Sequence, residues 1–282
     1  VAATLFSPLA HQAQGAHRWL HLGSFLFQPS ELAKITVPIF VGRLLAEHQT
    51  KPISKGKLLF ACLPICLLFM LLVKQPDMGS TVLLALTIVA MLFVANIRAT
   101  FLFGILGIGA AAVAFLMLHA DYRRRRLFAF LNPWADPQGH GFQSIQSFLS
   151  LHSGGIFGTG IGNGTSKLFY LPEVHTDFIF SLVGEELGFV GAIALLMLLL
   201  YFIYCLFKIS LVARNSFACL LSFGLSISFV LQIIVNLGGV TGLLPIKGLT
   251  LPFISWGRSA LLVNLAMMGI LLNILRTECA EK

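Results

Sequence analysis

Asp177 is the residue of this sequence best placed for acid-base chemistry. It ends the polar run Leu171-Pro-Glu-Val-His-Thr-Asp177 and stands directly before a long apolar segment that carries Glu185 and Glu186. The simpler interpretation is that this aspartate caps the helix that follows it. A carboxylate at the mouth of a water-filled cavity can instead act as a general base. No Ser/His/Asp triad is evident, because His175 and Asp177 are too close in sequence to define one.

The segment after Asp177 favours a cavity. At 100° per residue, Ser181, Gly184 and Gly188 fall near one stripe of the predicted helix. Adjacent glutamates inside an apolar run are unfavourable unless they are paired or hydrated. We therefore expect a small, polar strip that lines a cavity rather than a packed surface.

A second pair of ionisable residues, Glu31 and Lys34, lies in the run Gln28-Pro-Ser-Glu-Leu-Ala-Lys34. Pro29 suits the first position of a helix, where Glu31 would complement the helix dipole. The two ionisable residues are three apart and share a helix face. Such residues at a membrane edge usually face a bundle interior or a wet cavity, so we favour a cavity for both.

Four other polar features each allow a structural and a functional interpretation. The run Lys74-Gln-Pro-Asp77 is typical of an outer turn with a helix cap. The four arginines 123–126 would anchor lipid headgroups or clamp a phosphate, and the sequence favours the anchor. The glycine-rich run 153–164 lacks the Gly-Lys-Ser/Thr of a P-loop. Either its backbone N–H groups bind an anion, or the run is an irregular loop. Two prolines and three glycines break the connection 242–257, as is typical of a cavity wall at membrane depth.

Composition shows that membrane helices must position these residues. The chain has 282 residues, of which 57% are hydrophobic and 11% charged, and its mean hydropathy is +0.89. So few charges cannot cover a soluble domain, and so much apolar surface cannot stay disordered. The net charge of +8 comes from scarce acids (11) rather than abundant bases (19), so no nucleic-acid partner is expected. The five cysteines form neither a disulfide framework nor a zinc-site spacing.

Hydropathy predicts an all-α, polytopic helical membrane protein. A helix needs about 20 apolar residues to cross a bilayer. Seven transmembrane helices are predicted, at 30–47, 57–73, 78–95, 99–118, 178–207, 215–237 and 255–275. Residues 119–176 form a large extracytoplasmic loop between the fourth and fifth spans, and its aromatic residues favour an ordered loop. The start at Val1 rather than Met indicates that the single membrane domain, residues 1–282, is N-terminally incomplete.

Basic residues in the short loops predict the orientation, because cytoplasmic loops carry the excess of them. One side of the membrane receives nine, namely Arg43, Lys51, Lys55, Lys57, Arg98, Lys208, Arg214, Arg276 and Lys282. The other side receives five, namely Arg18, Lys34, Lys74, Lys247 and Arg258. The first side is therefore predicted to be cytoplasmic, which places loop 119–176 and a group of positive charges on the outer face.

Several of these motifs together resemble the SEDS family (shape, elongation, division and sporulation). The run from Phe169 to Gly188 resembles the most characteristic segment of that family. Four shorter motifs occur in family order: Gly15-Ala-His-Arg-Trp19, Gln28-Pro-Ser-Glu-Leu-Ala-Lys34, Gln75-Pro-Asp-Met-Gly79 and Leu251-Pro-Phe-Ile-Ser255. Asn132-Pro-Trp-Ala-Asp-Pro137 and Leu168-Phe-Tyr-Leu-Pro172 are more similar to the division branch of the family than to its elongation branch.

The resemblance implies a peptidoglycan glycosyltransferase that polymerises lipid II at the outer face of the bacterial cytoplasmic membrane, at the division septum. It implies a ten-helix fold, of which the seven predicted spans match the last seven. Asp177 matches the essential aspartate of the family. It would be the base for a sugar 4-hydroxyl that attacks a second lipid II, from which undecaprenyl pyrophosphate leaves. The implied partners are a cognate class B penicillin-binding protein transpeptidase, other division proteins and membrane lipid.

Positive charge is expected to receive the leaving pyrophosphate. The expected substrate-binding residues are Arg18, Glu31, Lys34, Lys74, Asp77, His175, Thr176, Lys247 and Arg258. Within this set, Glu31 would pair with or orient Lys34. A divalent cation such as Mg²⁺ or Mn²⁺ could bridge the pyrophosphate, although no compact ligand cluster marks a metal site. The run Gly257-Arg-Ser-Ala260 departs from the Gly-Gly-Ser-Ser common in the family, and its arginine adds bulk and charge to the expected cavity wall.

Two other functions stay open. A transporter that flips lipid II would need polar residues along the full membrane depth, whereas those of this chain gather toward the outer ends of the spans. A non-catalytic division scaffold would not need Asp177 at a cavity mouth. The sequence therefore favours the enzyme.

Overall fold

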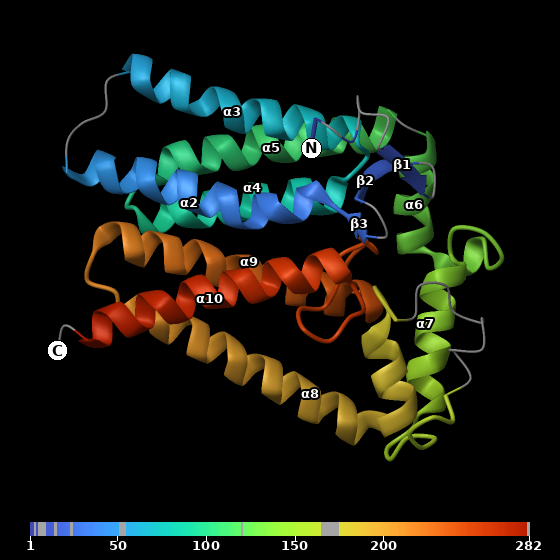
Figure 1. The fold of residues 1–282 in the computed structure, drawn as a ribbon. Coiled ribbons are helices and arrows are strands. Elements are labelled where there is room, and N and C mark those ends of the chain that lie inside the picture. The colour runs from blue at the N-terminus through green and yellow to red at the C-terminus, as the bar shows by residue number, and fades with distance from the viewer. Residues whose placement is uncertain are drawn as a thin grey trace. The chain divides into compact units, whose positions relative to one another are not determined.

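Helices dominate the part of the chain that the computed structural model describes (Figure 1). This part comprises residues 1–2, 4, 10–13, 16–22, 25–50, 55–119, 121–164 and 175–280. Contacts divide the chain into two units. Unit 1 consists of Val1–Leu102, Ile203–Leu231 and Gly257–Lys282, and unit 2 consists of Phe103–Phe202 and Gln232–Trp256.

Each predicted span coincides with a helix. These helices are α2 (Pro29–Thr50), α3 (Lys55–Lys74), α4 (Met78–Val94), α5 (Ala99–His119), α8 (Ile179–Val212), α9 (Ser216–Val240) and α10 (Arg258–Ala280). Among the described residues, three helical segments are long and apolar enough to cross a membrane: Ile179–Val212, Ser216–Val240 and Arg258–Glu278. The predicted helical fold is confirmed, while the number of seven crossings stays a prediction.

Close helix packing forms the core of unit 1. Figure 1 shows α2, α3 and α4 side by side, and α10 also contacts α2. One face of α2 is buried along its length, at Ala33, Val37, Val41 and Leu45, because residues four apart share a helix face. At Gly224 of α9, an added Cβ would lie 2.6 Å from the Met91 sulfur. The glycine leaves room for the Met91 side chain here, as small residues often do where membrane helices cross.

A small antiparallel sheet precedes α2, and the sequence analysis did not predict it. Its strands β1 (Ala10–Ala13), β2 (Ala16–Leu22) and β3 (Phe25–Phe27) pair in the order β1-β2-β3. The strands are too short to be found by a search for apolar runs of membrane length. Ser259 of α10 ties this sheet to α2, since its hydroxyl donates to Leu26 O and accepts from the Gln28 N–H.

The described part of loop 119–176 is ordered, as predicted. It contains α6 (Asp121–Leu131), the short 3₁₀ helix η1 (Pro133–Ala135) and α7 (Phe142–Ser153). Buried Ser147 joins α7 to two other helices of unit 2, because its hydroxyl lies 2.7 Å from the Ser181 hydroxyl and donates to Val240 O at 2.8 Å. Arg124, Arg125 and Arg126 of α6 are exposed. Their role as a lipid anchor or phosphate clamp stays a prediction.

The glycine-rich run after α7 lies against the backbone of α8. The N–H groups of Thr159 and Gly160 donate to the carbonyls of Glu185 and Glu186, each at 3.0 Å. The N–H groups of Gly154, Gly155, Gly158 and Asn163 also donate to backbone carbonyls. Because these N–H groups are already bonded, the structure favours the irregular loop over the anion-binding interpretation of residues 153–164.

The predicted polar strip on α8 is packed, so the expectation that Ser181, Gly184 and Gly188 line a cavity is wrong. Ser181 is fully buried and bonded to Ser147. A Cβ on Gly184 would lie 2.5 Å from a methyl carbon of Leu151 on α7. At Gly188, where φ is +70°, a Cβ would lie 2.3 Å from the Gly158 nitrogen. The physical reason is that small residues let backbones approach closely as readily as they leave space.

We expect Gly188→Ala to destabilise unit 2 more than Gly162→Ala. Both residues have positive φ, where alanine costs about 1–2 kcal/mol. A Cβ on Gly162 meets open space, whereas one on Gly188 meets the glycine-rich loop, and overpacking adds about 1–3 kcal/mol. Equilibrium unfolding in detergent measures both variants, and equal losses of stability would contradict the close packing at Gly188.

Candidate active site

The backbone of the turn before α8 holds Asp177 in place. Three consecutive carbonyls of this turn accept hydrogen bonds from residues 236–256. The N–H of Trp256 donates to His175 O at 2.8 Å, and the Ser255 hydroxyl donates to Thr176 O. The Asn236 amide donates to Asp177 O at 2.9 Å. We call residues 175–177 with these three donors the Asp177 clamp.

The same donors also fix the segment that faces the turn. The Asn236 amide makes a second bond, to Leu249 O at 2.8 Å, and the Ser255 hydroxyl accepts from the Leu251 N–H at 2.8 Å. Leu249 and Leu251 are almost fully buried. The turn and the connection 247–256 are therefore held as one local structure within unit 2.

An apolar cluster lies beside the clamp. Phe178, Phe180 and Val240 are buried together. Partly buried apolar residues packed against them are Leu151, Leu182, Ala192, Leu195, Leu237 and Ile246. Phe178 occupies the position directly before α8, and its carbonyl accepts from the N–H of Ser181 and of Leu182. Asp177 thus stands one residue earlier than the simple capping interpretation requires.

The carboxylate of Asp177 is half-buried and lies beside Gly248. Its Oδ2 atom is 3.4 Å from the place that a Cβ on Gly248 would occupy. Lys247, which is also half-buried, directly precedes this glycine. His175 is exposed and Thr176 is half-buried. Four of the predicted site residues therefore belong to one part of unit 2.

Glu185 and Glu186 both lie close to Gly164 of the glycine-rich loop. Glu185 is buried and Glu186 is half-buried. A Cβ on Gly164 would lie 3.1 Å from Glu186 Oε1 and 3.2 Å from Glu185 Oε2. Both carboxylates thus approach the end of the glycine-rich loop, which the sequence did not predict.

The other predicted site residues belong to unit 1, where Glu31 and Lys34 form a buried ion pair. Lys34 Nζ lies 2.8 Å from both carboxylate oxygens of Glu31. The Lys34 side chain is 0% exposed and that of Glu31 is 7% exposed. The predicted pairing is confirmed, and each charge neutralises the other in an environment where a lone charge is unfavourable.

Asp77 caps α4, as the structural interpretation of its turn predicted. Its carboxylate accepts from the Ser80 N–H at 3.1 Å and from the Ser30 hydroxyl at 3.0 Å. Arg18 of β2 binds the same turn, since Nε donates to Gln75 O at 3.3 Å and Nη2 donates to Pro76 O at 2.6 Å. These contacts give both residues a structural role at the start of α2 and α4.

Lys74 and Arg258 are the two remaining predicted residues of unit 1, and both are exposed. The predicted site residues are thus divided between unit 2, which holds the Asp177 clamp, and unit 1, which holds the Glu31–Lys34 pair. Among the described residues, no group of three or more His, Cys, Asp or Glu side chains could hold a metal ion.

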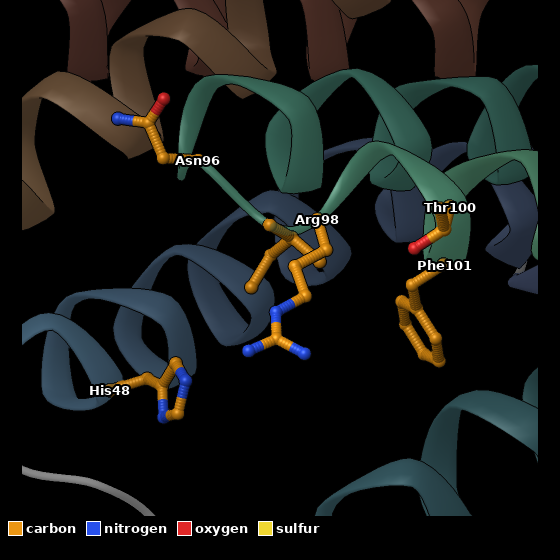
Figure 2. Close-up of a pocket in the computed structure, with 6 residues that line it drawn as sticks. His48, Asn96, Arg98, Thr100 and Phe101 are labelled. Atoms are coloured by element: carbon orange, nitrogen blue, oxygen red, sulfur yellow. The ribbon is translucent and has the colours of Figure 1, made fainter.

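One pocket of the described structure is lined by other residues and has a volume of about 670 Å³. Figure 2 shows His48, Asn96, Arg98, Thr100 and Phe101 among the residues that line it. His48 is 17 residues after Glu31 on α2, roughly 25 Å along the helix axis. None of the predicted site residues lines this cavity.

The sequence analysis missed Asn236, which contributes a donor to the Asp177 clamp. Its neighbour one turn earlier on α9, Gln232, is also buried. The available signal was a polar residue inside an apolar span, which usually marks a specific contact. Ser255 lies in the motif Leu251–Ser255, but the motif alone did not indicate which carbonyl it would bind.

Comparison with known proteins identifies the family. Residues 1–279 match the FTSW_RODA_SPOVE family model, described as "Cell cycle protein". The chain is 44% identical over 264 residues to the "Probable peptidoglycan glycosyltransferase FtsW" of Geobacter metallireducens, an alignment that covers 93% of this chain and 70% of that relative.

Two solved structures have the same fold. One belongs to a study of the "Structural coordination of polymerization and crosslinking by a peptidoglycan synthase complex". It has a TM-score of 0.77 at 31% identity, covering 98% of this chain and 77% of the other. The Thermus thermophilus rod shape determining protein RodA has a TM-score of 0.68 at 27% identity, covering 98% of this chain and 75% of RodA.

These similarities, together with the apolar helices, define a multi-pass helical membrane protein. The chain belongs to the FtsW/RodA/SpoVE family, which is the SEDS family. The resemblance that the sequence motifs indicated is therefore confirmed, including the similarity to FtsW.

We expect Lys34→Met to lower the stability of unit 1 by about 3–5 kcal/mol, because Glu31 would be left buried without its partner. The double variant Glu31→Leu/Lys34→Met should recover most of this loss. Arg43→Met is the matched control, since the Arg43–Glu47 pair on the same helix is exposed and such pairs contribute about 0–1 kcal/mol. Equilibrium unfolding measures all three variants. A loss for Lys34→Met as small as that for the control would contradict the role of the pair.

Proposed function

We propose that this chain carries the active site of a peptidoglycan glycosyltransferase that polymerises lipid II into glycan strands. The observation that carries the proposal is the Asp177 clamp, which holds the aspartate by its backbone beside Gly248. The similarity to relatives named peptidoglycan glycosyltransferase FtsW supports the reaction class. Catalytic groups must be held in place by their surroundings, and three donors on one turn meet this requirement.

In the proposed reaction, Asp177 is the general base. The 4-hydroxyl oxygen of one lipid II forms a bond to the anomeric carbon of a second lipid II. The bond between that carbon and the pyrophosphate oxygen breaks, and undecaprenyl pyrophosphate leaves with the electron pair. The hydroxyl proton passes to the Asp177 carboxylate. The three bonds of the clamp are accepted by backbone carbonyls and hold the turn that carries this carboxylate.

The leaving pyrophosphate is stable as an anion and needs positive charge rather than a proton. Because this leaving group needs no proton, one carboxylate suffices in the proposed reaction, whereas glycosidases use two. Lys247 is the best-supported cation for this role in unit 2, because it directly precedes the glycine beside Asp177. The charges of Glu31 and Lys34 nearly cancel, so this pair suits a positioning role. Lys74 and Arg258 are exposed and are further candidates for phosphate contact.

A lipid II transporter is the second candidate function, and the buried serines of α9 count against it. Ser222, Ser226 and Ser228 lie in the half of α9 that is predicted to be cytoplasmic. Each hydroxyl donates to a backbone carbonyl, of Cys219, Leu206 and Gly224 respectively. Because protein groups already satisfy these hydroxyls, they do not supply a polar path for a headgroup.

We further propose that the protein acts at the division septum with a class B penicillin-binding protein transpeptidase. The FtsW name of its relatives supports the septum, and the similarity to a synthase complex that coordinates polymerisation with crosslinking supports the partner. The most apolar part of α8 is only 11% buried within the chain, compared with 61% for α9. This helix therefore offers a long apolar surface to membrane lipid or to a partner helix.

We expect Asp177→Asn to reduce glycan polymerisation by about 10²–10⁴-fold, because the amide cannot accept the hydroxyl proton. The test uses the full-length protein reconstituted with lipid II and its transpeptidase partner. Asp136→Asn is the matched control, since Asp136 lies in the same predicted outer loop and its carboxylate accepts from the His140 N–H.

Unchanged polymer from Asp177→Asn would rule out this residue as the base. Translocation of lipid II by wild-type protein, without any polymer, would favour the transporter instead.

We expect Lys247→Gln to lower kcat/KM for lipid II about tenfold, which corresponds to about 1.4 kcal/mol of lost interaction with the pyrophosphate. Lys208→Gln is the matched control, because Lys208 is exposed and is predicted to face the cytoplasm. Steady-state polymerisation assays at constant ionic strength compare the two variants. Equal kcat/KM values would argue against a role for Lys247 in binding the leaving group.

A further inference from the structure

Asn236 is buried at the centre of the hydrogen bonds that surround Asp177. Its side chain lies on α9 and the residue is 3% exposed. Both of its donated bonds go to backbone carbonyls, one to Asp177 O at 2.9 Å and one to Leu249 O at 2.8 Å. A single amide group thus links a rigid helix to the turn that carries the base and to the segment opposite that turn.

The two bonds fix both sides of the contact between Asp177 and Gly248. Asp177 O belongs to the base itself, and Leu249 directly follows Gly248. The Leu249 N–H also donates to Lys247 O at 2.7 Å, which holds the lysine backbone to the same segment. Loss of the amide would therefore free the turn and the Lys247–Leu249 segment to shift relative to each other.

The Asn236 side chain interacts with its surroundings through its two N–H donors. Its Oδ1 atom is buried and has no hydrogen-bond partner among the described residues. An unpaired buried acceptor is unfavourable, so the two donated bonds must offset this cost. The benefit that the amide brings is its two donors, both aimed at the backbone around the proposed active site.

We propose that Asn236 is a positioning residue for the glycosyl transfer, acting through the backbone of Asp177 and of Leu249. This inference rests on the proposed function of Asp177. The reason is geometric: a base displaced by about 1 Å from its productive position can lose about 10²-fold in rate. The substrate itself need not touch Asn236 for this effect.

The test compares Asn236→Leu with wild type in the full-length protein with its partner. Leucine is close to asparagine in size and removes both donors. We expect kcat to fall by about 10- to 100-fold, while the affinity for lipid II, measured separately by binding, changes less than about threefold. A merely structural role would instead lower the amount of folded protein and leave kcat per folded molecule unchanged.

Ser226→Ala is the matched control. Ser226 is a buried residue of the same helix and also donates to the backbone of another element, at Leu206 O. It lies ten residues before Asn236 and outside the Asp177 clamp. The control should keep the wild-type kcat, whereas an equal kcat loss in both variants would overturn the proposal.

Ser255→Ala provides a second variant if Asn236→Leu does not fold. It removes the donor to Thr176 O in the same clamp and should also lower kcat with little change in lipid II affinity. Wild-type kcat in the folded variant would overturn the proposal.

Asp177→Asn, assayed in parallel, separates the two hypotheses. If it is inactive and Asn236→Leu has the wild-type kcat, only the positioning role is wrong. If Asp177→Asn is active, the base assignment is wrong, and the role of Asn236 is wrong with it.

Discussion

The hydrogen bonds to three consecutive backbone carbonyls are the constraint on which the proposed active site depends. Residues 175–177 lie at the end of a long loop, where a polar backbone would normally be hydrated and variable in position. Donors from Asn236, Ser255 and the Trp256 backbone fix this turn from one side. Because the donors bind backbone carbonyls, the clamp fixes the turn that carries Asp177. The proposed base is thereby held in position before the substrate arrives.

Several buried polar groups elsewhere in the protein are also satisfied by nearby groups. Glu31 and Lys34 neutralise each other, and the Asp77 carboxylate accepts from the first turn of α4. In an environment with little water, a lone charge or an unpaired hydrogen-bonding group is strongly unfavourable. In the described residues, three buried oxygens lack a hydrogen-bond partner: Ser210 Oγ, Asn236 Oδ1 and Asn264 Oδ1. At Asn236, the two bonds donated to Asp177 O and Leu249 O offset the cost of the unpaired oxygen.

The small residues of α8 are packed closely, whereas their pattern in the sequence suggested that they line a cavity. On α8, Gly184 and Gly188 are places of close packing against α7 and the glycine-rich loop. A helical wheel shows which residues share a face, but it does not show whether that face meets water or another backbone. The glycine-rich loop shows a similar limit of sequence patterns. Its N–H groups bind carbonyls of α8. Anion binding and backbone docking need the same donors, and only the tertiary structure distinguishes them.

The sequence by itself determined the membrane class, the place of each long helix and the family, and it led to Asp177 as the proposed base. These features depend on local hydropathy, on short motifs and on residue types, which are all present in the linear chain. The tertiary structure decided which distant groups meet. Asn236 is 59 residues from Asp177, and neither its position in an apolar helix nor any spacing rule indicates that partner. The small sheet before α2 likewise depends on pairing between strands, which adds backbone hydrogen bonds that hydropathy does not record. Long-range contacts of this kind arise from the packed fold, because their energy depends on geometry that no single segment contains.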